Sequence, residues 1–424
     1  MRTTFDTSLG ALIDVLRTSL SPDEIQNGLV LRDSSGRLAF FARDAIPEQR
    51  QADLATSMRA SLGAYLRDDL PIADASTPGV EPLFNDPGIL QLAEGDLRIR
   101  LLDRRIVGAD WVRGPLPEIV DDESRRMVFA SLKGGVGRST AIAVVAADAA
   151  RRGRNVLVID LDLEAPGIGS LLLDADRAPA FGTLDYLVET GLQDVDDRDL
   201  DEFVGTSALT DGAGLVHVIP VVGTKTKEAP ANYMAKLSRA MIEAVKLDRT
   251  IAVRDRLRAM VDRFAARRAY DLVLVDARAG MSELTAGPLL ALGASTVFLF
   301  ATAQQQSIES YRLLFAHLAT LVPGPPSPWH AFQMVHAKAT LDDNTHQWLT
   351  DELVDLFAEY LYEEAEGTEA FNFQPGDPAA PHTPVPILFD TKFVSWDPVK
   401  TPTQLSQNAY NATFGSLLAK IEDP

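Results

Sequence analysis

The glycine-rich segment at residues 133–140, which reads KGGVGRST, constrains the fold of this chain more than any other feature. An apolar run, Met127–Ala130, enters it as a short buried strand would. Ala141–Arg152 leaves it with the alanine and valine content of a buried helix, which Gly153 can end. Glycines allow successive backbone N–H groups to turn toward an anion at the positive end of a helix. The segment therefore predicts a strand, a phosphate-binding loop and a helix in immediate succession.

Carboxylates follow two other strand-like runs. Asp160 and Asp162 come directly after Asn155–Ile159, and Asp276 ends the run DLVLVD at residues 271–276. Wholly apolar strands that alternate with helices are typical of a parallel sheet covered on both faces, and ligands of such sheets gather at the carboxyl ends of the strands. We therefore expect the three aspartates near the predicted phosphate-binding loop.

The glycine loop resembles the deviant Walker A loop of the ParA/MinD family of P-loop ATPases, in which a second, signature lysine stands directly before the glycine pair. Lys133 occupies that position, whereas Leu132 and Arg138 stand where the strict Walker pattern has its first glycine and its lysine. The segments at 160–162 and 276–280 are similar to the switch I and switch II sequences of the family. The resemblance covers about residues 124–424 and implies an α/β fold with a mostly parallel, doubly wound P-loop NTPase sheet.

The resemblance also implies a role for each residue of an ATP site. The phosphate-binding residues are Gly134, Gly135, Val136, Gly137, Arg138, Ser139 and Thr140. Ser139, Asp160 and Asp276 are the predicted magnesium residues, since Mg²⁺ prefers hard oxygen ligands. Asp162 would position the hydrolytic water, and Arg138 would bring its charge to the phosphates in place of the usual lysine.

Two further expectations concern a second subunit and the base. Lys133 would cross a two-fold interface to the nucleotide of the other subunit, so that ATP forms a homodimer and hydrolysis releases it. Adenine would lie near His336 and the region after Asp390, although a strand-end histidine without a ligand is an equally good interpretation. Arg278 stands where the family often has proline, and the sequence leaves open whether it contacts phosphate or a partner protein.

Residues 1–118 form a predicted small α+β domain, which the resemblance does not cover, and residues 119–424 form the predicted ATPase domain. Apolar residues on one helical face at 8–20 and a candidate hairpin at 29–42 support this α+β prediction. We expect an unidentified partner protein to bind it. The arginines at 98, 100, 104 and 105 are better explained as charges that defend a strand edge than as a partner contact.

Composition limits the partners. The net charge of −20 and the pI near 4.7 leave nucleic acid possible but not favoured. A helical stretch predicted at 231–268 is rich in basic side chains, but interleaved aspartates favour a solvated surface over a DNA or partner contact. The chain has no cysteine, which excludes disulfides and thiolate metal sites. It shows neither a signal-peptide core nor an apolar run of membrane length, so we expect a cytoplasmic protein without membrane attachment.

Three functions fit these observations. The first is a Mg²⁺-dependent, dimerising ATPase switch with slow turnover that acts on a protein partner. Arg138 motivates the second, an ATP-gated scaffold with little or no hydrolysis, because a guanidinium is longer and forked and does not simply replace an ammonium. The third is an ATP-using biosynthetic enzyme that resembles dethiobiotin synthetases, which requires an acceptor pocket that the sequence does not identify.

Overall fold

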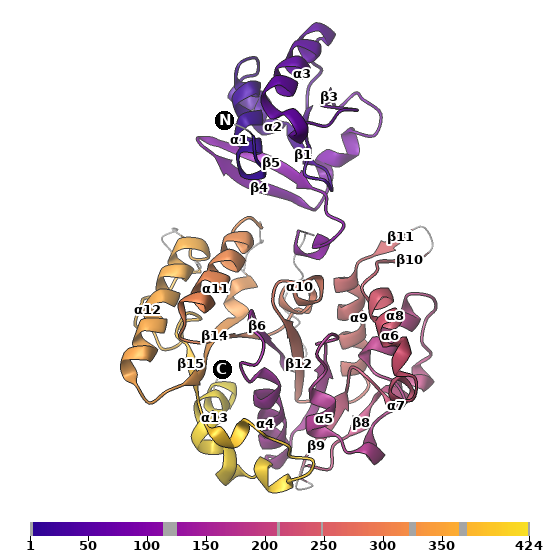
Figure 1. Cartoon of the computed structure of the whole chain (residues 1–424), viewed down its shortest axis with the longest axis vertical. Helices are drawn as coiled ribbons and strands as arrows, with labels where there is room; N and C mark the ends of the chain where they lie inside the picture. Colours follow the sequence, from indigo (N-terminus) through magenta and orange to yellow (C-terminus); the bar gives the residue numbers. More distant parts are fainter. Residues whose placement is uncertain are drawn as a thin grey trace. The chain divides into compact units, whose positions relative to one another are not determined.

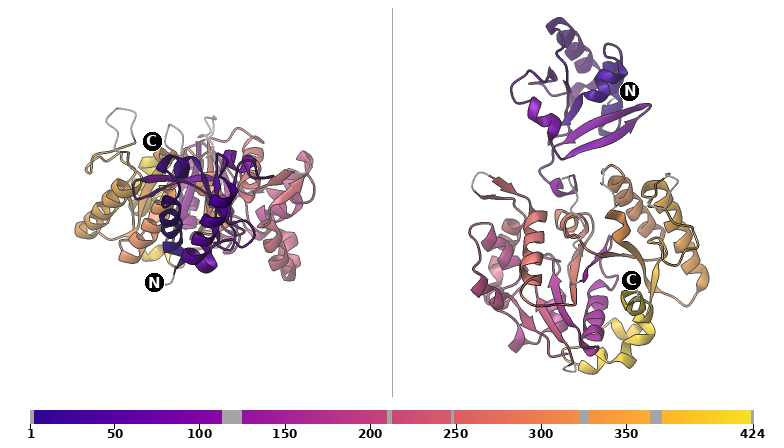
Figure 2. Two further views of the ribbon diagram at one scale, coloured as in Figure 1. Left: turned by 90° about the horizontal axis from the view of Figure 1, so that it is seen from above. Right: turned by 180° about the vertical axis from the view of Figure 1, so that it is seen from behind.

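The computed structural model describes residues 3–112, 125–209, 213–246, 249–321, 328–363 and 371–422. The chain divides into two compact units, one of residues 1–115 with 317–324 and the other of residues 116–316 with 325–424. The predicted domain border at residues 118 and 119 lies outside the described residues. Each unit is built on a sheet of its own (Figure 1, Figure 2).

The first unit is an α+β fold in which helices pack on a mixed sheet. Its helices are α1 (Phe5–Arg17), α2 (Pro22–Asn27) and α3 (Glu48–Leu62). Its strands are β1 (Leu29–Arg32), β2 (Leu38–Ala42), β3 (Ile72–Asp74), β4 (Ile89–Glu94) and β5 (Leu97–Asp103), in the spatial order β3-β2-β1-β5-β4. Helix α1 buries Leu9, Leu12, Ile13 and Leu16, the face that the helical spacing predicts. Strands β1 and β2 pair antiparallel, so the predicted hairpin and α+β class are confirmed.

The prediction that the arginines at 98, 100, 104 and 105 defend a strand edge is wrong. Strand β5 lies between β1 and β4 rather than at an edge, because β4, which the sequence pattern did not reveal, covers it. Its arginines therefore defend no edge. Arg104 pairs with Asp86 at 2.9 Å and Arg105 with Asp103 at 2.7 Å, so ion pairs within the unit engage both. Strand β3 pairs parallel with β2 at the other edge of this sheet.

The second unit is built on a sheet with the spatial order β15-β14-β13-β6-β12-β7-β9-β8. Its strands are β6 (Arg125–Ser131), β7 (Asn155–Asp160), β8 (Gly205–Thr206), β9 (Leu215–Ile219), β12 (Leu272–Ala279), β13 (Thr296–Ala301), β14 (Phe332–Ala339) and β15 (Val385–Leu388). The described neighbours are parallel except for β8 and β9. Strand β6, which leads into the glycine loop, lies between β12 and β13. The predicted mostly parallel, doubly wound P-loop sheet is confirmed.

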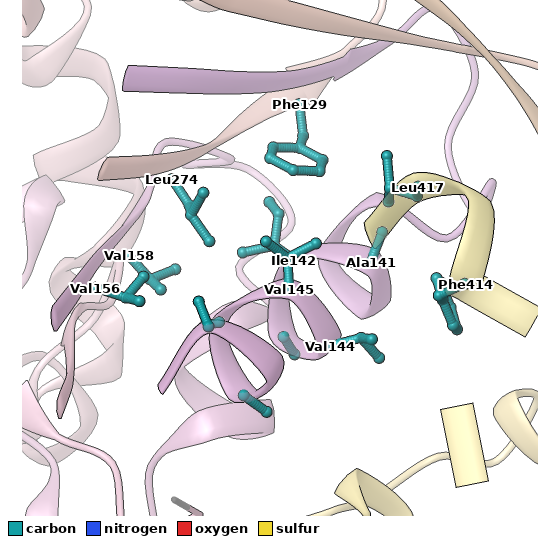
Figure 3. Close-up of a cluster of buried hydrophobic side chains, with 14 of the residues drawn as sticks. Phe129, Ala141, Ile142, Val144, Val145, Val156, Val158, Leu274, Phe414 and Leu417 are labelled. Carbon is teal, nitrogen blue, oxygen red and sulfur yellow. The ribbon is translucent and has the colours of Figure 1, made fainter. Parts of the chain in front are cut away.

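Helix α4 (Arg138–Arg151) packs against one face of this sheet, and helix α13 (Gln407–Glu422) packs beside it (Figure 3). Figure 3 shows Ile142 of α4 between Phe129 and Leu274 of the sheet. Phe129 is fully buried, and its ring centroid lies 5.1 Å from that of Phe298 on β13. The small alanine side chains of α4 allow the sheet and α13 to pack closely against this helix. The packing fixes the helix whose first turn continues the glycine loop.

The remaining helices complete the second unit. They are α5 (Ile168–Leu172), α6 (Thr183–Thr190), α7 (Thr224–Glu228), α8 (Tyr233–Ala240), α9 (Val253–Ala265), α10 (Glu283–Leu290), α11 (Gln305–Leu318) and α12 (Asp343–Tyr360). Helices α10 and α12 lie across the sheet from α4 (Figure 1). No helix in the described ranges is both long and apolar enough to cross a membrane.

The predicted continuous helical stretch at 231–268 is wrong. Helices α8 and α9 are separated by an antiparallel hairpin of β10 (Ala244–Lys246) and β11 (Arg249–Ile251), whose β-branched residues favour a strand over a helix. Arg256, predicted on the solvated face, is buried. It donates to the backbone carbonyls of Leu187, Ala240 and Ile242, and so satisfies acceptors near the ends of two helices.

Candidate functional site

The glycine loop leaves the sheet at the carboxyl end of β6. Ser131, the last residue of this strand, donates its hydroxyl to the carbonyl of Lys133 at 2.7 Å, which turns the chain into the loop. Gly135 and Gly137 have φ angles of 70° and 97°, in the left-handed region that favours glycine. A Cβ atom added at either position would meet nothing within 4 Å, so the space over the loop is open. The first turn of α4, whose N–H groups lack helical acceptors, is therefore accessible to an anion.

Arg138 and Ser139, at the start of α4, contact Asp276 on β12 and Asp162 in the loop after β7. Arg138 Nη2 donates to Asp162 Oδ2 at 3.1 Å, and its Nε lies 3.8 Å from Asp276 Oδ1. Ser139 Oγ donates to Asp276 Oδ2 at 2.5 Å. Asp276 in turn stands in register with Asp160 on β7. The structure thus brings these five residues, all predicted for the site, together at the carboxyl ends of adjacent strands.

Asp160 differs from the other two aspartates because its carboxylate binds its own loop. Oδ1 accepts the N–H of Asp162 at 3.0 Å, and Oδ2 accepts the N–H groups of Gly167 and Ile168, each at 3.2 Å. Full burial and, next to it, the charge of Asp276 raise the pKa of Asp160 well above its usual value. Asp160 thus shapes the loop at 162–168, and its place near magnesium stays a prediction.

The other two carboxylates are also buried in low-dielectric surroundings. Burial raises the pKa of Asp276 to about 6, although Arg138 and the Ser139 hydroxyl act to lower it. Burial likewise raises the pKa of Asp162, against the lowering effect of Arg138. Arg138 Nη1, Asp162 Oδ1 and Asp276 Oδ1 are buried and find no hydrogen-bond partner among the described residues. Such atoms are costly to bury, so the cluster suits a ligand that carries both negative and positive charge.

A magnesium ion with a phosphate fits these residues better than a metal bound by protein alone. In the described parts of the chain, no group of three or more His, Asp and Glu side chains could hold a metal ion. Mg²⁺ commonly takes one or two protein ligands and completes its coordination with phosphate oxygens and water. The contact between Ser139 Oγ and Asp276 Oδ2 brings two hard oxygen atoms together for that purpose.

Lys133, the predicted signature lysine, reaches toward the loop that follows β13. Its Nζ donates to Gln304 Oε1 at 3.2 Å, in a solvent-exposed contact. An exposed hydrogen bond of this kind stabilises the folded chain only modestly, so the ammonium can change partners at low cost. Its contact with the nucleotide of a second subunit stays a prediction.

A cavity of about 370 Å³ lies beside the glycine loop. Residues 135–140 of the glycine loop and the first turn of α4 form part of its lining. The other lining residues belong to β14, β15, α13 and the segment between β15 and α13, and they are Lys338, Ile387, Leu388, Phe389, Asp390, Phe393, Val394, Thr413 and Phe414. The volume, and the aromatic and aliphatic side chains that β15, α13 and the segment between them contribute to the lining, suit an aromatic base next to a phosphate-binding loop. The predicted base-binding region around Asp390 therefore lies at this cavity.

His336 lies on the same strand as Lys338 but is buried against helix α12. Its ring stacks on that of His346 with centroids 5.2 Å apart, and the two Nδ1 atoms are 2.9 Å apart. Burial and, less strongly, the charge of His346 lower the pKa of His336 to about 4. The ring is neutral near pH 7, with Nδ1 engaged. This geometry favours the interpretation without a ligand, and the contact of His336 with the base stays a prediction.

The sequence did not predict the contacts that hold the two switch segments. Arg278 on β12 pairs with Glu164 in the loop after β7. Tyr233, at the start of α8, donates its hydroxyl to the carbonyl of Leu163 in the same loop. The segment that resembles switch II is part of the sheet as far as Ala279, because β12 continues to that residue. Arg278 is the only one of these with a signal in the sequence, since it stands where the resemblance expects proline.

Comparison with known families bears on the chemistry of this site. The family model for the CobQ/CobB/MinD/ParA nucleotide binding domain matches residues 127–272. This segment is a ParA/MinD-like nucleotide-binding domain. It contains the glycine loop, α4, Asp160 and Asp162, so the resemblance to the ParA/MinD type is confirmed. Asp276 and His336 lie beyond the matched segment.

Solved structures similar to this chain include a ParA family ATPase and a putative plasmid partition protein. One is a ParA family ATPase from Chlorobium tepidum, with 18% identity, a TM-score of 0.44, and coverage of 69% of this chain and 99% of that chain. Another is a putative plasmid partition protein from Borrelia burgdorferi bound to AMPPNP, with 16% identity, a TM-score of 0.42, and coverage of 71% and 99%.

A third similar structure is a cobyrinic acid a,c-diamide synthase from Mycobacterium smegmatis with bound ADP and magnesium. It has 20% identity, a TM-score of 0.36, and coverage of 61% of this chain and 91% of that chain. A search of curated proteins gives no match. The functional argument therefore rests on the family match and on the geometry of the site.

Proposed function

We propose that this protein is a cytoplasmic, Mg²⁺-dependent ATPase switch that dimerises with ATP, hydrolyses it slowly and acts on a protein partner through its first unit. The observation that supports this most is the convergence of Arg138, Ser139, Asp162 and Asp276 beneath an open glycine loop. Phosphoryl transfer needs positive charge on the phosphates, a divalent ion and an oriented water. In this proposal Arg138 supplies the charge, Ser139 and Asp276 bind the ion, and Asp162 orients the water.

Each residue has a defined task in this proposal. The N–H groups of Gly134–Thr140 bind the phosphates, and Arg138 adds a positive charge to them. Ser139 and Asp276 hold Mg²⁺, which neutralises charge on the terminal phosphates when bound. Asp162 accepts a hydrogen bond from the attacking water and orients it. Arg138 engages Asp162 Oδ2 at 3.1 Å and the other carboxylate oxygen, Oδ1, is buried, so a water molecule reaches this carboxylate only after the pair or its surroundings move, which is consistent with slow turnover.

The same ion pair supports a second candidate, an ATP-gated scaffold with little or no hydrolysis. In that case Arg138 stays on Asp162 when ATP binds, and the carboxylate never becomes available to a water molecule. Both candidates bind ATP and dimerise through Lys133. They differ in the release of phosphate.

Two measurements test the proposal. Sedimentation velocity of the full chain is expected to show a monomer that becomes a dimer with ATP and Mg²⁺, and Lys133→Ala is expected to abolish this shift. The control is Lys225→Ala, since Lys225 is also exposed but pairs with Glu228 on α7. A wild-type chain that stays monomeric with ATP would count against the dimerising switch.

Phosphate release separates the switch from the scaffold. The switch predicts slow release that falls at least tenfold in Asp162→Ala, with ATP affinity largely retained. Release that this variant does not reduce would rule out the role of Asp162. Wild-type release no faster than buffer, together with tight ATP binding, would select the scaffold.

A further inference from the structure

We propose that Arg138 is an internal counter-ion that occupies the cation's place between Asp162 and Asp276 in the nucleotide-free protein, so that a divalent cation binds only after phosphates have drawn Arg138 away. The cation's place is defined by the Asp276 carboxylate and the Ser139 hydroxyl, and Asp162, the residue proposed to orient water, lies on the other side of the guanidinium. This inference rests on the proposed function for its second step, the displacement by phosphate, but not for its first.

The contacts of Arg138 support the first step. Its guanidinium bridges a carboxylate of the loop after β7 and one of β12, with Nη2 at 3.1 Å from Asp162 Oδ2 and Nε at 3.8 Å from Asp276 Oδ1. The side chains of Arg138, Asp162 and Asp276 are only 7%, 9% and 1% exposed. Water therefore screens these charges little, and the carboxylates depend on a nearby cation.

The shape of the side chain explains why arginine suits this task. A guanidinium presents donors in a planar fork and can reach two carboxylates at once, whereas an ammonium acts as a single point charge. A divalent cation that approached the occupied pair would face the positive charge of Arg138.

The unpartnered atoms support the second step. Arg138 Nη1 is buried without a hydrogen-bond partner among the described residues, so one end of the guanidinium is available to another anion. Arg138 also lines the cavity beside the glycine loop, where the phosphates of the proposed nucleotide would lie. Once Arg138 turns to a phosphate, Asp162 and Asp276 lose their counter-ion and gain affinity for a divalent cation. Nucleotide and cation therefore bind with positive coupling, which is reciprocal by linkage.

Mn²⁺ binding to the full chain without nucleotide tests the first step directly, with free Mn²⁺ followed by electron paramagnetic resonance. We expect the wild type to bind Mn²⁺ weakly, Arg138→Gln to bind it at least tenfold more tightly, and the added Asp276→Asn substitution to abolish the gain. Arg256→Gln is the matched control, because Arg256 is equally buried but contacts backbone carbonyls, and it is expected to behave as the wild type.

Arg138→Lys is a second variant in case Arg138→Gln does not fold, since lysine keeps a positive charge in the site. It is expected to bind Mn²⁺ more tightly than the wild type and less tightly than Arg138→Gln. Equal Mn²⁺ affinity in wild type, Arg138→Lys and Arg138→Gln would overturn the inference. These titrations contain no nucleotide. A failure of the chain to bind ATP would therefore contradict the proposed function, whereas the Mn²⁺ affinities would still test the place of Arg138.

The second step is tested by titrating ATPγS into the wild type with and without Mn²⁺. We expect at least tenfold tighter nucleotide binding with Mn²⁺ in the wild type and a smaller ratio in Arg138→Gln, in which the cation is already bound. The same ratio in both proteins would overturn the coupling through Arg138.

Discussion

Arg278 and Glu164 form an ion pair that ties the end of β12 to the loop after β7. Two residues before each of them, Asp276 and Asp162 share the guanidinium of Arg138. The two segments that resemble switch I and switch II are therefore joined twice by arginines, once inside the site and once at its rim. Neither arginine is the residue that the resemblance expects at its position.

The rim pair is predicted to position Asp162. Glu164→Ala or Arg278→Ala frees the 162–168 loop from β12, and we expect phosphate release to fall about tenfold, a change of about 1.4 kcal/mol in the activation free energy. The charge-swapped double variant, Glu164→Arg with Arg278→Glu, is expected to recover most of this loss. Thermal unfolding should change little, because the pair is partly exposed and contributes at most about 1 kcal/mol.

Arg312 and Glu359 provide the control for this prediction. They form a similar pair between α11 and α12, also in the second unit, and both side chains are partly exposed. Arg312→Ala and Glu359→Ala are expected to leave phosphate release unchanged. Single variants at Arg278 and Glu164 that also leave it unchanged would show that the rim pair does not position Asp162.

Stability should depend on pH through Asp276. Its pKa is about 6 in the folded chain, above the ordinary value of 3.8, because burial disfavours the charged form. The protonated carboxyl therefore stabilises the fold below pH 3.8, and this contribution is lost as the pH rises through about 6. A shift of this size corresponds to about 3 kcal/mol.

Asp276→Asn supplies the comparison, since its amide does not titrate. In denaturant unfolding without metal or nucleotide, the free energy of unfolding of the wild type relative to Asp276→Asn is expected to decrease by about 2 kcal/mol from pH 4 to pH 7, the larger part of the full effect. A difference that is flat, or that grows in favour of the wild type, would show that Asp276 is not held in its neutral form by burial.

The predicted division into two domains is tested by two matched core substitutions. Phe40 on β2 and Phe129 on β6 are both fully buried, each in the core of its own unit. Truncation to alanine is expected to cost about 3 to 5 kcal/mol in either case. If the units unfold independently, calorimetry will show two transitions, and each variant will lower only one of them. A single transition lowered equally by both variants would contradict two independent domains.

The central part of the fold could be predicted because its signals are local. Met127–Ala130, the glycine loop and α4 are contiguous, so the apolar periods and the left-handed glycines specify the strand, the turn and the helix together. The aspartates could be placed because parallel strands bring their carboxyl ends to one edge of the sheet. The sequence thus predicted that Arg138, Ser139 and the three aspartates lie close together, as the structure shows.

The remainder depends on contacts that no local pattern encodes. The β10–β11 hairpin interrupts a stretch with a helical spacing of charges, and its stability comes from pairing across the turn rather than from periodicity. Strand β4 was missed because its residues alternate only weakly between buried and exposed. The direction of the Arg138 side chain, toward Asp162, could not be read from the loop, since it depends on a residue 24 positions away.

The central claim, that the glycine loop binds ATP, is tested most directly by calorimetric titration of ATP with Mg²⁺ into the wild type and two glycine variants. Gly137 and Gly79 have φ angles of 97° and 84°, and a Cβ at either meets nothing within 4 Å, so alanine strains both positions alike. Gly137 begins α4 at the site, whereas Gly79 lies in the first unit. We predict one ATP per chain for wild type and Gly79→Ala, and at least tenfold weaker binding for Gly137→Ala. No binding to the wild type, or equal affinity in all three proteins, would contradict the claim.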